Sequence, residues 1–118
     1  MSKHNELGKK GEEIARVFLM NKGHQVLAVN YRYGHKEIDL ISTIDGCLVC
    51  SEIKTRSTLK FGFPEEAVTL HKQNFIKEAA TAYWEDHPEF RECRFDVISI
   101  IITGNRVCQI KHFEDAFF

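Results

Sequence analysis

The sequence contains no low-complexity tract, no internal repeat and no long block of like charges. These absences, together with 43% hydrophobic and 28% charged residues, exclude a disordered chain and indicate an ordinary globular protein. No apolar run is long enough to cross a bilayer, so we expect no membrane partner. The first residues, MSKHNELGKKGEE, are polar where a signal peptide needs an apolar segment. We therefore expect a cytoplasmic protein with reduced thiols.

The formal net charge is only −1, and this sum neither indicates nor excludes a nucleic-acid partner. The distribution of charge is uneven, however. Residues 1–36 carry seven Lys and Arg against three Asp and Glu, and residues 54–77 carry five against two. Residues 37–53 carry four acids and no base, and residues 78–96 carry six acids against two bases. Two basic segments thus flank a short acidic one, although solvated helix faces would give the same pattern.

The length and the hydrophobic periodicity predict one α/β domain over residues 1–118. Apolar residues repeat at helical spacing in residues 5–22, and Gly23 is a typical helix stop. A second helix is predicted from about His71 to Asp86. Strands are predicted at 25–33, 37–44, 47–55, 95–103 and 107–113. The order α-β-β-β-α-β-β indicates a mixed central sheet flanked by helices.

The dipeptide Asp45-Gly46 separates the second and third predicted strands and favours a two-residue type I′ turn. This turn fixes a register that places Asp39 opposite Glu52 and Glu37 opposite Lys54. Alternation sorts the side chains of the hairpin into two faces. One face is predicted to be core, and it holds Ile38, Leu40, Ser42, Ile44, Val49, Ser51 and Ile53. The other face carries the four charged residues, and near the turn it holds Ile41, Leu48 and Cys50.

Directly opposed residues of an antiparallel pair have Cβ atoms about 5 Å apart, so Asp39 and Glu52 would repel each other. The repulsion is relieved if both carboxylates bind one hard cation, Mg²⁺ or Mn²⁺, with the backbone carbonyl of Ile53 as a further ligand. Lys54 is predicted to share this face, where its ammonium would hold a phosphate oxygen or orient a metal-bound water. The competing interpretation is a solvated sheet face on which Glu37 and Lys54 form a surface ion pair.

The first predicted helix offers a further acid. Glu12 lies at the edge of the apolar stripe, near Ala15 and Leu19, where it would face the sheet. It is equally well placed to pair with Arg16 on the surface at i,i+4 spacing, and the spacing alone does not decide between the two.

The residues Asp39 and Glu52-Ile53-Lys54 resemble the PD-(D/E)xK site of restriction-endonuclease-like nucleases. Further segments resemble the YraN-like proteins, an uncharacterised bacterial family: GKKGEEIARVFL, VNYR, EIDLI, EIKTR, FGFPEEAV, RFDVISI and IKHFEDAF. The resemblance covers nearly the whole chain. It implies a single domain with a restriction-endonuclease-like fold of the Holliday-junction-resolvase kind, and metal-dependent nuclease activity. By position it also assigns Glu12 to the site, while Lys36 stands where a glycine is common.

The resulting hypothesis is a Mg²⁺- or Mn²⁺-dependent nuclease that hydrolyses phosphodiester bonds, with DNA, including branched recombination intermediates, as the favoured substrate. Asp39, Glu52 and Glu12 would bind the metal, and Lys54 would stabilise the transition state. Seven residues are candidates for nucleic-acid contacts: Lys9, Arg32, Arg56, Lys60, Lys72, Gln73 and Lys77. The alternative is a nucleic-acid-binding protein with a catalytically inactive site. The sequence leaves a homodimer open.

Four cysteines raise a third alternative, a zinc or thiol-redox site: Cys47, Cys50, Cys93 and Cys108. Residues three apart on a regular strand point to opposite faces, so single buried cysteines are the favoured interpretation. The six histidines show no ligand spacing and are expected to be surface or capping residues: His4, His24, His35, His71, His87 and His112.

Overall fold

A computed structural model describes residues 3–57 and 69–117 of the chain. Its elements, in chain order, are α1 (Lys3–Asn21), β1 (Gln25–Tyr33), β2 (Lys36–Ile44), β3 (Cys47–Arg56), α2 (Leu70–Glu85), β4 (Glu92–Thr103) and β5 (Arg106–Phe117). The predicted order α-β-β-β-α-β-β is confirmed. Lys60 and the segment FGFPEEAV, both used above, lie outside the described residues.

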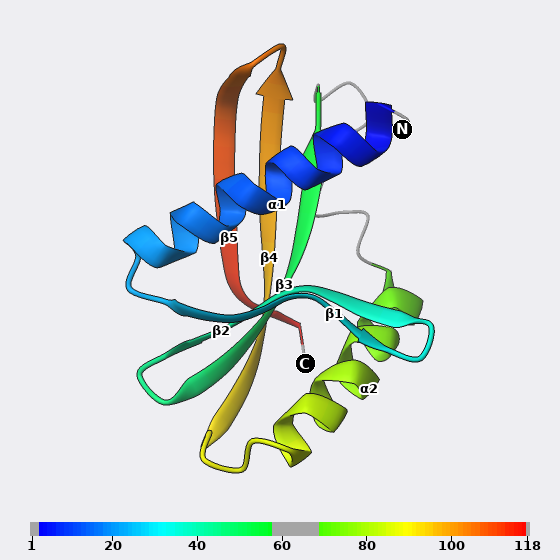
Figure 1. The fold of residues 1–118 in the computed structure, drawn as a ribbon, viewed down its shortest axis with the longest axis vertical. Coiled ribbons are helices and arrows are strands. Elements are labelled where there is room, and N and C mark those ends of the chain that lie inside the picture. Colours follow the sequence, from blue (N-terminus) through cyan, green and yellow to red (C-terminus); the bar gives the residue numbers. More distant parts are fainter. Residues whose placement is uncertain (1–2, 58–68, 118) are drawn as a thin grey trace.

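The five strands form one sheet in the order β1-β2-β3-β4-β5 (Figure 1). β3 and β4 are parallel, and the other neighbouring strands are antiparallel, so the sheet is mixed as predicted. Parallel neighbours need a crossover connection, and α2 lies in the segment that joins β3 to β4. α2 begins after Thr69, whose Oγ1 accepts a hydrogen bond from the backbone N–H of Lys72 at 3.2 Å.

The β2–β3 hairpin has the predicted turn and register. Asp45 and Gly46 have φ angles of 52° and 79°, and a type I′ turn requires both to be positive. The pairing runs from Ile44↔Cys47 to Leu40↔Ser51. Beyond that pair β2 stays with β1 and turns away from β3, which continues upward beside β4 behind α1 (Figure 1). The two strands of the hairpin therefore separate at a defined point.

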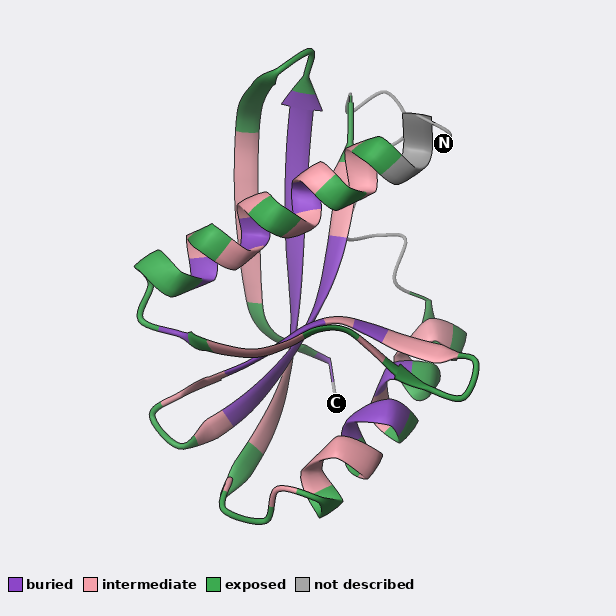
Figure 2. Ribbon diagram, in the orientation of Figure 1, coloured by how far each residue is buried: buried purple, intermediate pink, exposed green. Residues whose placement is uncertain are grey.

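β4 is buried along most of its length (Figure 2). Apolar side chains cover both faces of the sheet. On the α1 face the buried cluster consists of Ala15, Leu19, Leu40, Ile53, Ile98, Ile100 and Ile102. On the α2 face it consists of Ile38, Ile41, Leu48, Cys50, Ile76, Ala79, Ala80, Val97 and Phe117.

The second face of the hairpin is core near the turn, as its apolar residues Ile41, Leu48 and Cys50 indicate, because α2 packs on it and buries them. The assignment of Ile38 to the first face was wrong. Ile38 and Leu40, predicted to share a face, lie in different clusters. The alternation of β2 therefore breaks at Asp39, where β2 leaves β3.

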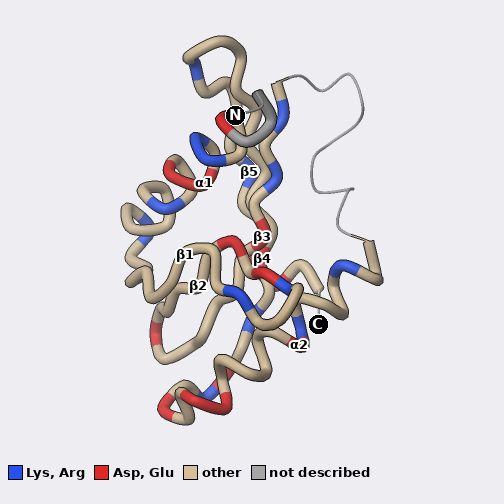
Figure 3. The backbone as a smooth tube through the Cα atoms, turned by 45° about the vertical axis from the view of Figure 1, so that its right-hand side comes forward, with Lys and Arg blue, Asp and Glu red and all other residues tan. Residues whose placement is uncertain are grey.

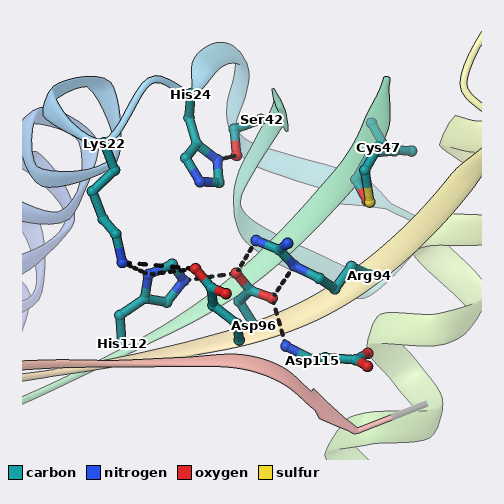
Figure 4. Close-up of polar contacts among 10 residues, drawn as sticks. Lys22, His24, Ser42, Cys47, Arg94, Asp96, His112 and Asp115 are labelled. Carbon is teal, nitrogen blue, oxygen red and sulfur yellow. Dashed lines mark hydrogen bonds and ion pairs between the residues drawn. The ribbon is translucent and has the colours of Figure 1, made fainter. Parts of the chain in front are cut away.

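A buried polar network centres on Asp96 of β4, which is fully buried (Figure 4). Nε and Nη2 of Arg94 donate to its two carboxylate oxygens at 2.9 and 3.0 Å. Nε2 of His112 lies 2.6 Å from Oδ2, and the backbone N–H of Asp115 donates to Oδ1 at 3.0 Å. Asp115 has a φ of 52° and lies where the β4–β5 register shifts, so β5 bulges around this carboxylate.

Two histidines depart from the expectation of surface or capping roles. His24 is 5% exposed, and its Nδ1 lies 2.9 Å from Oγ of the buried Ser42. The side chain of His112 is 3% exposed. Nδ1 of His112 lies 2.7 Å from Nζ of Lys22, which is only a donor, so Nδ1 accepts and Nε2 donates to Asp96. Both histidines satisfy polar groups beneath the end of α1.

The cysteines follow the prediction only in part. Cys50 is buried in the α2-face cluster, Cys47 and Cys93 are half-buried, and Cys108 is exposed. Cys108 contradicts the expected burial because it lies on β5, at an edge of the sheet. Neither helix of the described chain is long and apolar enough to cross a membrane.

Candidate functional site

Asp39 and Glu52 occupy the first positions beyond the last β2–β3 pair, Leu40↔Ser51. We call this point the fork. The predicted pairing of Asp39 directly opposite Glu52 is not part of the ladder, which ends one pair earlier. Instead, the backbone N–H of Ile53 donates to Oδ2 of Asp39 at 2.9 Å. The side chain of Asp39 thus satisfies a backbone donor of β3 at the place where β2 has moved away.

Glu52 is an enclosed acid of the fork, with a side chain only 3% exposed. Its Oε1 lies 3.5 Å from Nζ of Lys54 and 3.4 Å from Nζ of Lys72. Among the described residues, its Oε2 is buried and has no hydrogen-bond partner. Burying a carboxylate oxygen without a partner is costly, so this atom marks a position that a further cation would stabilise.

Lys54 contacts Glu52 and not Glu37, so the predicted Glu37–Lys54 pair was wrong. Glu37 lies opposite Arg32 on β1, and Nε of Arg32 is 3.4 Å from Oε2 of Glu37. The reason is the separation of the strands, because β2 carries Glu37 away with β1. The interpretation of this hairpin as a solvated face with a surface ion pair loses the contact on which it depended.

α1 brings Glu12 to the fork, and Gly11 allows the close approach of the helix. A Cβ on Gly11 would lie 1.9 Å from Oγ1 of Thr55 on β3, so only glycine fits there. Arg16 pairs with Glu13, with Nε donating to Oε2 at 3.0 Å. The surface alternative for Glu12, a pair with Arg16, is therefore wrong.

Burial and mutual repulsion raise the pKa values of two acids of the site. The pKa of Asp39 is raised to about 8, by burial first and then by the charge of Glu52, against the lowering effect of the Ile53 N–H. Burial also raises the pKa of Glu12, although a side-chain hydrogen bond with Asn30 opposes it, and Glu37 and Glu52 add repulsion. Ionising all the carboxylates of the fork at once is therefore energetically unfavourable.

The donor set at the fork fits a hard divalent cation. The described residues contain no cluster of three His, Cys, Asp or Glu side chains already arranged as a metal site. Asp39 and Glu52 nevertheless are neighbouring carboxylates, and Oε2 of Glu52 has a vacant acceptor position among the described residues. A cavity of about 230 Å³ opens beside Asp39, lined by Leu7, Gly8, Glu12, Asp39, Ile53, Lys54, Thr55 and Arg56. Mg²⁺ commonly binds through one or two carboxylates and keeps several waters, and this arrangement would allow that.

The structure brings three of the predicted nucleic-acid contacts close to the fork. Arg56 lines the cavity, Lys9 is near enough to lower the pKa of Glu12, and Lys72 contacts Glu52. Arg32 is held on the β1–β2 hairpin by Glu37, and Gln73 and Lys77 lie on the first two turns of α2. Basic positions on α1 and at the start of α2 thus lie on either side of the acidic positions of the strands (Figure 3).

A larger cavity, of about 590 Å³, lies at the other end of the sheet, between the turn at Asp45 and Trp84 of α2. Its Arg94 is already occupied by Asp96, and the surrounding segment, residues 78–96, is acidic. None of the described residues that line this cavity has a buried carboxylate oxygen without a partner, as Glu52 has, and we place the candidate site at the fork.

Sequence reasoning missed Asn30, which bonds to Glu12. Asn30 has a φ of 53°, a conformation that asparagine tolerates better than most residues. An asparagine within an apolar strand pattern was therefore an available signal. The contact of Lys72 with Glu52 had no local signal, because 20 positions separate the two residues along the chain.

The Gly11→Ala variant is expected to lower the free energy of unfolding by about 1–3 kcal/mol, because its methyl group would overlap Thr55. Gly8→Ala is the matched control on the same helix, since a Cβ at Gly8 meets nothing within 4 Å. The control should gain up to about 1 kcal/mol from helix propensity. Urea unfolding of both variants tests this, and equal effects would contradict the close approach of α1 to β3.

Comparison with known proteins gives consistent matches over the chain. Residues 11–100 match the family described as "Uncharacterised protein family UPF0102". A UPF0102 protein of Natranaerobius thermophilus is 44% identical over 113 residues, which cover 93% of this chain and 95% of the relative. A UPF0102 protein of Christiangramia forsetii is 42% identical over 118 residues, which cover 100% of this chain and 98% of the relative. The YraN-like resemblance is confirmed, and the chain belongs to the uncharacterised family UPF0102.

Proposed function

We propose that this chain is a nuclease that hydrolyses phosphodiester bonds of nucleic acid with Mg²⁺ or Mn²⁺ bound at the fork. The observation that carries the proposal is the buried Oε2 of Glu52, which has no hydrogen-bond partner within residues 3–57 and 69–117 and lies beside Asp39, whose pKa is raised to about 8. Glu52 is buried and Asp39 is half-buried, and two neighbouring carboxylates removed from solvent in this way destabilise a fold unless a cation compensates them. Carboxylates that hold a divalent cation beside a lysine are suited to phosphoryl chemistry.

Asp39 and Glu52 would hold the metal, and Glu12 would contact it directly or through water. The carbonyl of Ile53 is a further candidate ligand, because the N–H and C=O of one strand residue point to the same side and its N–H binds Asp39. A bound divalent cation supplies Lewis-acid stabilisation of a phosphate and a water of lowered pKa. Lys54, anchored on the same strand as Glu52, would hold the developing negative charge of the scissile phosphate.

The charge distribution supports a nucleic-acid substrate at this end of the molecule. Lys9 and Arg56 flank the fork from α1 and β3, and Lys72 reaches it from α2. The opposite end carries the acidic segment 78–96, which would repel a phosphate backbone. Binding through such basic residues should weaken strongly as salt concentration rises.

Purified protein is expected to cleave at least one substrate of a panel of branched, duplex and single-stranded DNA and RNA, and only with Mg²⁺ or Mn²⁺. Asp39→Asn and Glu52→Gln should each lower the cleavage rate by at least about a hundredfold, because each removes a metal ligand. Glu13→Gln is the control, since it removes an exposed carboxylate that pairs with Arg16 away from the fork. Cleavage that survives in both site variants, or that persists in EDTA, would contradict the proposal.

The alternative is a nucleic-acid-binding protein that does not cleave. The contacts of Lys54 and Lys72 with Glu52 favour it, because two ammonium groups partly neutralise the acid without any metal. Retained binding to the panel, with no cleavage under any metal condition, would support this alternative and overturn the nuclease proposal.

A further inference from the structure

Two lysines from different elements share one oxygen of Glu52. Nζ of Lys54 and Nζ of Lys72 lie 3.5 and 3.4 Å from Oε1. Lys54 lies two residues along the same strand, so its position is fixed by β3. Lys72 reaches the fork from the start of α2, the helix in the connection between β3 and β4. Two cations on one oxygen are more than a single carboxylate needs, and one of them is available for another partner.

The position of Lys72 within α2 is not explained by the stability of the helix. Lys72 is the third residue after the cap Thr69, where glutamate would complete a capping box. The first turn of α2 contains no acid, so a lysine there adds positive charge to the positive end of the helix dipole. Its ammonium is stabilised instead by Glu52 of the fork.

The exposure of the two lysine side chains indicates which ammonium group can move away from Glu52. The side chain of Lys54 is 19% exposed and that of Lys72 is 40% exposed. Lys72 thus borders both the buried carboxylate and solvent, and it lies in the first turn of α2, where the helix dipole favours phosphate groups. A short rotation of its flexible stem would move the ammonium from one to the other.

We propose that Lys72 is an exchangeable cation, which neutralises Glu52 while the fork is empty and contacts a backbone phosphate of nucleic acid when a divalent cation occupies the fork. This inference rests on the proposed function. It makes metal binding and nucleic-acid binding mutually reinforcing, because the cation at the fork releases the ammonium that the phosphate needs. By linkage, the coupling must appear equally in both affinities.

The test uses Lys72→Met, with Lys77→Met on the same helix as the matched control. Calorimetric titration with Mn²⁺, without nucleic acid, is expected to show about fivefold tighter binding to Lys72→Met than to the wild type, since a competing charge is gone. Fluorescence anisotropy with a short duplex DNA then measures the Kd for DNA in the absence and in the presence of Ca²⁺. The ratio of the first Kd to the second measures how much the bound cation strengthens DNA binding. Lys72→Met should keep the metal-free Kd and lose several-fold of this ratio. Lys77→Met removes a candidate phosphate contact that does not pair with Glu52, so it should weaken DNA binding equally with and without Ca²⁺ and leave the Mn²⁺ affinity and the ratio unchanged.

The outcomes separate this inference from the proposed function. Tighter Mn²⁺ binding with a reduced ratio supports the exchange. If the wild type binds Mn²⁺ but Lys72→Met binds it no more tightly than Lys77→Met does, the exchange is overturned and the metal site stands. If Lys72→Met weakens DNA binding equally with and without Ca²⁺, Lys72 is a permanent phosphate contact and the exchange is likewise overturned. If the wild type binds no Mn²⁺, the proposed function and the exchange fall together.

Discussion

The Asp39→Asn variant is expected to unfold at a higher urea concentration than the wild type at about pH 8, when no divalent cation is present. Burial and the charge of Glu52 both disfavour the ionised form of Asp39, and they raise its pKa to about 8. Asparagine removes the charge and keeps an oxygen that can accept from the Ile53 N–H, the bond now made at 2.9 Å. The same change removes a proposed metal ligand, so the stabilised variant should no longer bind Mn²⁺.

The stability difference between Asp39→Asn and the wild type depends on pH. A carboxyl whose pKa is raised on folding favours the protonated native state, so its contribution to stability is fully present below the unfolded pKa of about 4. That contribution is lost as the pH rises towards the folded pKa of about 8. The difference between Asp39→Asn and the wild type should therefore grow between these values, to the order of several kcal/mol.

Urea unfolding in EDTA, at several values between about pH 4 and pH 8, measures this difference. Asp45→Asn is the matched control, because it makes the same chemical change in an exposed turn and Asn-Gly also suits a type I′ turn. At saturating Mn²⁺, about a hundred times its Kd, the wild type should gain about 2.7 kcal/mol and Asp39→Asn nothing. A constant difference across the pH range would show that the Asp39 carboxyl carries no burial cost.

The local features of the hairpin could be read from the sequence. Asp45-Gly46 determines a turn type, the turn determines the register, and the register carried the prediction correctly as far as Leu40↔Ser51. The presence of Asp39 and Glu52 at one end of the hairpin follows from the same reasoning. The turn type depends on only a few neighbouring residues, so it can be predicted without any knowledge of the rest of the fold.

The fork itself could not be read in this way. β2 separates from β3 because it continues to pair with β1, and no residue near Asp39 is a sequence signal for this separation. The consequences are nonlocal as well, since Glu37 pairs with Arg32 and Ile38 turns to the α2 face. Similarly, the contact of His112 with Asp96 depends on how β5 bulges beside β4. These features arise from packing between distant segments, which override the local period of two.

The Arg94→Met variant is expected to lower the free energy of unfolding by about 3–5 kcal/mol at neutral pH, because it leaves the buried charge of Asp96 without its main ion pair. Arg94 makes two of the hydrogen bonds to this carboxylate, which is fully buried (Figure 4). The control Arg91→Met removes an exposed neighbouring arginine and should have little effect. The double variant Arg94→Met with Asp96→Asn should recover part of the loss, since no uncompensated charge remains.

The pH dependence distinguishes the charge of Asp96 from the packing of the arginine stem. Burial raises the pKa of Asp96, but the hydrogen bonds from His112, Arg94 and the Asp115 N–H outweigh it, so the net pKa lies below the usual value. Its stabilising contribution is therefore present above the unfolded pKa of about 4 and is lost as the pH falls through the folded pKa. Without Arg94, the carboxyl loses a hydrogen-bonding and a charge contribution that lower its pKa, so it takes up a proton at higher pH than in the wild type. The deficit of Arg94→Met in urea unfolding should consequently shrink as the pH falls to about 4 and below. A deficit of constant size over the whole pH range would instead assign the loss to packing of the Arg94 stem.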